Sequence, residues 1–209
     1  MGTRNLTMVI DRQGNLKVSQ YGQWYGYPSG QGVTILEFAR NKENITKLEN
    51  RFNIINFFNE CNDIDKYINE FSNKKIKTKE DIYFFEKLTT KDLGGEILQS
   101  IIDLDLKNLP KEMNNKIYLK NSIEFGKDSL MCEWAYCINL QTNKLEVFKG
   151  FNRNKSQEHE RFKTTEEDVE YFKDKNYCYY GMQLIKEYDL NNLPIEEEFI
   201  NELEFNEEE

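Results

Sequence analysis

The sequence predicts a single α+β domain, in which hairpins near the two ends of the chain form a mostly antiparallel sheet around a helical middle region. Apolar residues alternate with a period of two near the start and in the last third, as in strands with one buried face. Between these parts they recur every three or four positions, which is the period of an amphipathic helix. A chain of 209 residues suits one core, so residues 1–209 are treated as one domain.

The first half of the chain divides into a hairpin segment, 1–32, and a helical segment, 33–106. In the hairpin, a turn over 11–15 joins two strands, and the loop over 21–32 carries four of the chain's eleven glycines. We expect the helical segment to begin with a helix over 33–40. The pair Gly94 and Gly95 would weaken an exposed helix, so this part should pack closely against a neighbour.

The second half contains strands and a helix over 116–190, then an acidic helix and tail over 191–209. A return strand is expected over 145–149, a helix capped by Thr164 or Thr165, and a further strand within 177–188. Pro194 should begin the final helix. The return strand should follow a long strand whose buried face carries Leu130, Cys132, Trp134, Tyr136 and Ile138.

The net charge of −9 is unevenly distributed. Residues 1–186 hold all 28 Lys and Arg against 27 acidic residues, whereas residues 187–209 hold the other ten acidic residues. Two interpretations of the tail stay open: a helix that docks on the core with a solvated face, or an electrostatic lure for a basic partner. With a neutral body and an acidic end, we expect no direct binding of nucleic acid.

Location follows from what the sequence lacks. No apolar run approaches the roughly 18–20 residues that span a bilayer, and the start of the chain has no apolar signal segment. We therefore expect a cytoplasmic protein without membrane contact. Nothing in the sequence indicates an oligomeric state.

Common catalytic and cofactor motifs are not present in the sequence. The single histidine, His159, lies in a very polar segment and should be solvated, which disfavours histidine-based triads. Neither glycine-rich nucleotide-binding pattern occurs. Cys132 and Cys137 are five apart, so on one strand they would face opposite sides, and the four cysteines match no zinc spacing. We expect no metal, no cofactor and buried free thiols.

The glycine-rich loop is the candidate ligand-binding site. Glycines allow close approach to a ligand, aromatic side chains offer rigid contact surface, and a guanidinium on the first strand could hold a carboxylate or phosphate. The alternative is an aromatic loop that only covers the sheet edge. The predicted ligand-binding residues are Arg4, Gln23, Trp24, Tyr25 and Tyr27.

These residues lie in blocks that resemble a family of hypothetical proteins from phage, bacterial and fungal genomes. The blocks are 2–7, 20–24 and 26–32, with later ones at 91–98, 132–136 and 145–150, so the resemblance covers about residues 2–151. It implies a shared fold and, for a phage relative, a role against host defence. This sequence has Tyr25 where the family pattern leads us to expect aspartate, so a catalytic role of that acid would be lost here.

A second resemblance concerns the opening of the chain. Gly2-Thr3, a strand, a glycine turn and a return strand are similar to the start of N-terminal-nucleophile hydrolases, which implies Thr3 as nucleophile and Lys17 as the group that tunes its amine. The leading hypothesis is a phage or mobile-element accessory protein that inhibits a host protein or sequesters a small-molecule ligand. Whether the protein is an enzyme is left open, with an amide hydrolase using Thr3 as the alternative.

Overall fold

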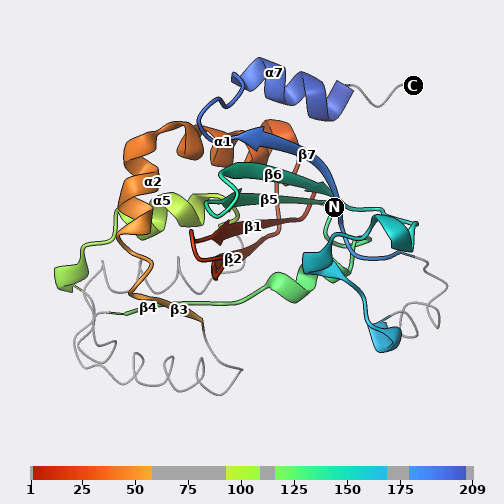
Figure 1. Cartoon of the computed structure of the whole chain (residues 1–209), viewed down its shortest axis with the longest axis horizontal. Helices are drawn as coiled ribbons and strands as arrows, with labels where there is room; N and C mark the ends of the chain where they lie inside the picture. Colours follow the sequence, from red (N-terminus) through yellow and green to blue (C-terminus); the bar gives the residue numbers. More distant parts are fainter. Residues whose placement is uncertain (1, 58–92, 109–115, 169–178, 206–209) are drawn as a thin grey trace.

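The computed structural model describes residues 2–57, 93–108, 116–168 and 179–205. A five-stranded sheet in the order β2-β1-β5-β6-β7 forms its centre (Figure 1). β1 and β5 are parallel, and the other neighbouring pairs are antiparallel. The predicted α+β class with a mostly antiparallel sheet is therefore confirmed. The strands are β1 (Asn5–Ile10), β2 (Leu16–Gly22), β5 (Trp134–Asn139), β6 (Lys144–Lys149) and β7 (Gln183–Asp189).

Helices cover one face of this sheet. α1 (Val33–Arg40) contacts α2 (Lys42–Glu49), α5 (Glu96–Ile102) and α7 (Glu196–Ile200), and Figure 1 shows α7 beyond β7. Their apolar sides join Val9, Tyr136 and Val147 of the sheet in one core cluster. The remaining short helical elements are η1 (Pro28–Gly32), η2 (Leu106–Asn108), η4 (Ile123–Lys127), η5 (Lys155–Gln157), η6 (Glu160–Phe162) and η7 (Asn201–Phe205).

The opposite face of the sheet packs against short turns rather than long helices. Alternation along β1 directs Leu6, Met8 and Ile10 to this side, where they meet Phe148 and Phe162 in a second core cluster. No helix within the described ranges is long and apolar enough to cross a membrane.

Two local predictions are confirmed closely. α1 spans Val33–Arg40 as expected, and its Ile35 and Leu36 are fully buried. The double glycine packs tightly, because a Cβ on Gly95 would lie 2.7 Å from Cγ1 of Ile35. The Gly95 amide donates to Oε1 of Gln31 at 2.6 Å, which joins α5 to the segment before α1.

The long strand predicted around residue 130 is wrong in its first half. The amides of Met131 and Cys132 donate to the carbonyl of Asp128, so these residues form a turn and β5 begins only at Trp134. The turn breaks the alternation with period two. Cys132 and Cys137 consequently lie in the same core cluster, instead of on opposite faces as predicted.

The helical middle is also only partly correct. A short strand, β3 (Ile55–Phe57), pairs in parallel with β4 (Ile117–Leu119), so this region contains sheet as well as helix. A strand of three residues is too short for periodicity to separate strand from helix. Predicted helices over 58–92 lie outside the described residues, as does the start of the strand predicted within 177–188. The Thr165 cap is present, since its Oγ1 accepts from the Asp168 amide at 3.2 Å.

Candidate functional site

The end of the sheet where β1 and β5 begin collects the candidate residues. One row of paired residues crosses all five strands there: Gly22, Asn5, Trp134, Lys149 and Gln183. Five strands spaced about 4.8 Å apart span roughly 19 Å. The glycine-rich loop and the turns over 128–133 and 150–158 all continue from this row, so segments far apart in sequence share one end of the molecule.

The backbone of the glycine-rich loop is fixed against β1. The Gly26 amide donates to the Thr3 carbonyl at 2.8 Å, and the buried Tyr136 hydroxyl donates to the Gly26 carbonyl at 2.9 Å. A Cβ on Gly26 would lie 2.9 Å from the Arg4 carbonyl oxygen, so glycine is required for this close approach. The loop backbone therefore lies at the end of the sheet where the central strands β1 and β5 begin, while the side chains of Trp24 and Tyr25 are exposed.

Large hydrophobic side chains are exposed mainly at this end. Five of the seven exposed ones within the described ranges come from its loops, and the other two are Ile185 and Ile195. We call the five the sheet-end surface. Its members and their exposed fractions are Trp24 50%, Tyr25 67%, Tyr27 38%, Met131 42% and Phe151 48%.

Two members of the sheet-end surface have a left-handed backbone. Tyr25 has φ 56° and Phe151 has φ 55°, a region in which an L-residue with a bulky side chain costs roughly 1–2 kcal/mol. Neighbouring hydrogen bonds hold both residues: the Gln31 amide donates to the Tyr25 carbonyl at 2.8 Å, and the Phe151 amide donates to the Ser129 carbonyl at 2.7 Å. Glycine would avoid this strain, yet aromatic residues occupy both positions.

Arg4 lies beside this surface but is engaged by its own chain. Its side chain is 17% exposed, Nη1 lies 2.9 Å from Sδ of Met131, and Nη2 lies 3.6 Å from Oε1 of Glu133. Nε is buried without a hydrogen-bond partner. Arg4 therefore links the start of β1 to the residue before β5. Its binding of an external anion stays a prediction, since the guanidinium must first move from Glu133.

The structure brings only some of the predicted ligand-binding residues together. A Cβ on Gly2 would lie 2.0 Å from Cε3 of Trp24, so the indole covers the chain two residues before Arg4. Gln23 turns away, because its Oε1 accepts from the Tyr21 hydroxyl on β2. Tyr27 immediately precedes η1, whose Ser29 amide is bound by Glu204 of the C-terminal helix. One pocket shared by Arg4, Trp24 and Tyr27 therefore stays a prediction.

The residues of the hydrolase alternative lie far apart. Thr3 precedes β1 at the sheet end, whereas Nζ of Lys17 forms an ion pair with Asp11 at 3.4 Å, beside the hairpin turn. β1 has six residues, which at about 3.3 Å each separate the two ends of the strand by roughly 20 Å. Lys17 therefore cannot influence an amine at Thr3 through direct contact.

His159 is not solvated as predicted, because its ring packs on Phe148 with 5.0 Å between centroids. Its Nδ1 accepts from the Arg161 amide at 3.2 Å. Burial, and secondly the charge of Arg161, lowers the pKa of His159. The ring is half-buried, and the polar sequence around it did not reveal this packing, since Phe148 belongs to β6.

The two described cysteines are poorly placed to act as nucleophiles. Burial raises the pKa of the Cys137 thiol, which disfavours the nucleophilic thiolate. Cys132 and Cys137 are both buried and unpaired, as expected. In the part of the chain that the structure describes, no three His, Cys, Asp or Glu side chains are placed to hold a metal ion.

The acidic C-terminal helix is docked on the body. Phe199 is fully buried and Leu203 nearly so. Glu202 accepts from the Tyr188 hydroxyl at 2.8 Å and pairs with Nζ of Lys186 at 2.9 Å. The Glu204 carboxylate accepts from the Ser29 amide at 2.6 Å, so the helix also holds the end of the glycine-rich loop. These contacts support the docking interpretation for residues up to 205.

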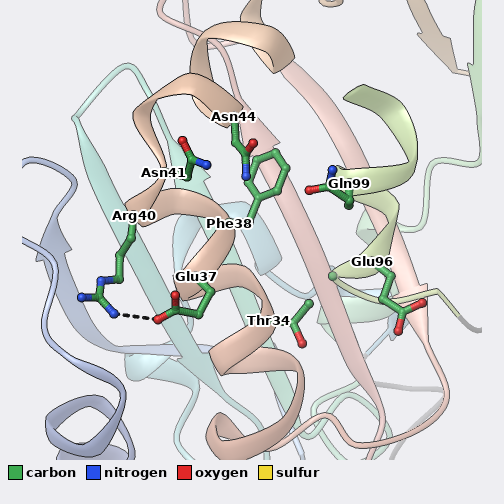
Figure 2. A pocket seen from close by; sticks show the side chains of 9 residues that line it. Thr34, Glu37, Phe38, Arg40, Asn41, Asn44, Glu96 and Gln99 are labelled. Atoms are coloured by element: carbon green, nitrogen blue, oxygen red, sulfur yellow. Dashed lines mark hydrogen bonds and ion pairs between the residues drawn. The ribbon is translucent and has the colours of Figure 1, made fainter. Parts of the chain in front are cut away.

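A cavity of about 730 Å³ lies where α1, α2 and α5 meet (Figure 2). In Figure 2, Asn41, Asn44 and Gln99 lie around the ring of Phe38, while Thr34 lies between Glu37 and Glu96. Phe38 is 6% exposed and Glu37 pairs with Arg40 at 2.7 Å. The lining residues are Thr34, Glu37, Phe38, Arg40, Asn41, Asn44, Gly95, Glu96 and Gln99.

The sequence did not reveal this cavity or two of the five members of the sheet-end surface, Met131 and Phe151. Thr34 and Glu37 lie on the polar side of α1, and Asn41 and Asn44 follow at the start of α2, but polar residues in these places are also typical of any solvated helix. Phe151 gave no signal, since one aromatic residue in a polar segment has many explanations. Comparisons with protein-family models, curated proteins and solved structures found no match for this chain.

Proposed function

We propose that this protein acts by binding another protein through the sheet-end surface. The observation that carries the proposal is the left-handed backbone of two exposed aromatic residues, Tyr25 and Phe151, at the same end of the sheet. Each costs the free protein stability that glycine would not cost. Phe151 contacts the ring of Tyr179 at 6.3 Å between centroids, yet both strained side chains stay largely exposed, which is explained if they are anchors for a partner.

The chemistry of the sheet-end surface suits a protein partner. Aromatic residues and Met are enriched in protein interfaces, and aromatic anchors carry much of the binding free energy. Burying an exposed side chain of this size contributes roughly 1.5–3 kcal/mol. Trp24, Tyr25 and Phe151 together could therefore support a specific complex. The partly buried ion pair between Arg4 and Glu133 lies at the rim, where it would influence specificity more than affinity.

The biological setting of the proposal comes from the resemblance to phage-encoded proteins. We infer that the partner is a host protein, such as a defence component, and that the chain inhibits or sequesters it. Support for this setting is limited to the blocks in residues 2–151, and it is separate from the geometric argument for binding. A small molecule would be the ligand instead if purified protein retains one and no macromolecule.

Affinity purification from the native host tests the proposal. The tagged protein should retain a specific partner, and Trp24→Ala and Phe151→Ala should each lower its recovery at least tenfold, as expected for interface anchors. Ile195→Ala is the matched control, because Ile195 is as exposed as Trp24 but lies away from the sheet end. Equal recovery with all three variants, confirmed as folded by thermal melts, would exclude the sheet-end surface as the binding site.

A further inference from the structure

The cavity between α1, α2 and α5 has polar groups that the fold does not use. Within the described ranges, the Asn44 side-chain amide and the Glu96 carboxylate make no hydrogen bond or ion pair. Gln99 donates its Nε2 to Asp103 at 2.8 Å, which leaves Oε1 as an acceptor. Asn44 is half-buried and Glu96 and Gln99 are exposed, and all three line an open pocket of about 730 Å³, a size typical of ligand pockets.

The unused groups are mostly acceptors of hydrogen bonds. Glu96, Gln99 and Asn44 each present at least one oxygen, while Glu37 lies on the other side of Thr34 from Glu96 in Figure 2. The positive side chain in the lining, Arg40, is already paired with Glu37. A phosphate or carboxylate ligand would meet unfavourable charge from Glu96. A ligand with several donors and a positive charge would satisfy the lining.

We propose that this cavity binds a guanidinium group. A guanidinium presents five N–H donors in one plane and pairs with carboxylates in a fork. Glu96 would accept the charge-assisted hydrogen bonds, while Asn44 and Gln99 accept further bonds beside Phe38. The group would come from an arginine side chain of a partner protein or from a free guanidinium compound. This site lies on the helical layer and does not depend on the sheet-end surface.

The test is a titration of the ¹⁵N-labelled protein, followed by NMR, with N-acetyl-arginine methylamide. Amide shifts should concentrate at the cavity, in α1, α2 and α5. The neutral isostere N-acetyl-citrulline methylamide should bind at least fivefold more weakly, because a charge-assisted hydrogen bond at a partly exposed site is worth about 1 kcal/mol. Equal shifts with both probes, or shifts that lie mainly outside the cavity, would overturn the proposal.

Variants of the lining give a second, independent readout. Glu96→Gln should raise the dissociation constant about fivefold. Asn44→Asp, which adds an acceptor with a charge, should lower it. The matched control is Glu197→Gln, which removes another exposed carboxylate in the first turn of a helix and should change nothing. An unchanged affinity in Glu96→Gln, with an unchanged thermal melt, would contradict the proposed guanidinium site.

The source of the guanidinium is decided by comparing agmatine with a blocked alanine-rich heptapeptide that has one central arginine. Affinity at least tenfold higher for the peptide assigns a protein segment, whereas equal affinity assigns a free compound. If neither shifts the cavity residues, no guanidinium site exists there.

Discussion

Replacing Tyr25 by glycine and by alanine tests the backbone conformation on which the proposed function rests. Both substitutions remove the same exposed phenol, so the lost contacts cancel when the two variants are compared. They differ in what the backbone tolerates. Alanine at φ 56° keeps the steric cost of the left-handed region, whereas glycine adopts it freely.

The expected difference has a defined sign and size. At an ordinary position alanine is more stable than glycine by roughly 0.5–1 kcal/mol, because glycine loses more entropy on folding. At Tyr25 the order should reverse, with Tyr25→Gly more stable than Tyr25→Ala by about 1 kcal/mol. That corresponds to ~2–4 °C in Tm for a chain of this size. Trp24 is the control, since it is not among the residues with positive φ and its alanine variant should be the more stable.

Thermal or denaturant unfolding measures the stability order of Tyr25→Gly, Tyr25→Ala, Trp24→Gly and Trp24→Ala. Affinity purification measures how much partner each variant recovers. Tyr25→Gly should fold well and still lose most of the partner, which separates binding from stability. If Tyr25→Ala is at least as stable as Tyr25→Gly, the left-handed conformation is wrong. If Tyr25→Gly keeps full recovery, the strain has another cause and the binding argument fails.

Three other regions give predictions that can be checked by unfolding experiments. Arg161→Met should lower the free energy of unfolding by about 3 kcal/mol, because it leaves the buried Glu146 carboxylate, 2.7 Å from Arg161 Nη1, without its charge partner. Adding Glu146→Leu should restore much of that stability. No recovery in the double variant would contradict the charge argument. Deleting 201–209 should lower Tm by ~6–12 °C through loss of the buried Leu203 and the contacts of Glu202 and Glu204, whereas Glu197→Gln should have little effect. The folded-state pKa of His159 is below 6.5, so the unfolded chain binds the proton more readily than the folded protein. Stability should therefore fall as pH decreases through about 6.5, and His159→Asn should flatten that dependence.

The fold was predictable wherever local chemistry and period agreed over many residues. The first hairpin has alternating apolar residues and a turn with Gly14 at φ 87°, and α1 has eight residues with one apolar side, so both were placed correctly. β5 was extended too far, because apolar alternation before Trp134 persists through a turn that is set by hydrogen bonds to Asp128. Periodicity reports burial, and buried residues in a turn can imitate a strand.

The candidate site was predictable only in part, for a related reason. A loop with four glycines and four aromatic residues is recognisable in sequence, but the contribution of Met131 and Phe151 depends on which strands are neighbours. That order comes from the parallel pairing of β1 with β5, which joins residues more than a hundred positions apart. Arg4 illustrates the same limit, since its engagement by Glu133 follows from that pairing.

The contacts that hold the glycine-rich loop affect the entropy cost of binding a partner at the sheet-end surface. Three elements hold the loop from different sides: Thr3 before β1, Tyr136 in β5 and Glu204 in η7. A loop held in this way loses little backbone entropy when a partner binds, so the main ordering cost is about 0.5–1.5 kcal/mol for each immobilised side chain. The aromatic residues can therefore contribute most of their burial to affinity. This arrangement favours recognition by a preformed surface and places the acidic helix, through Glu204, among the elements that keep the surface in shape.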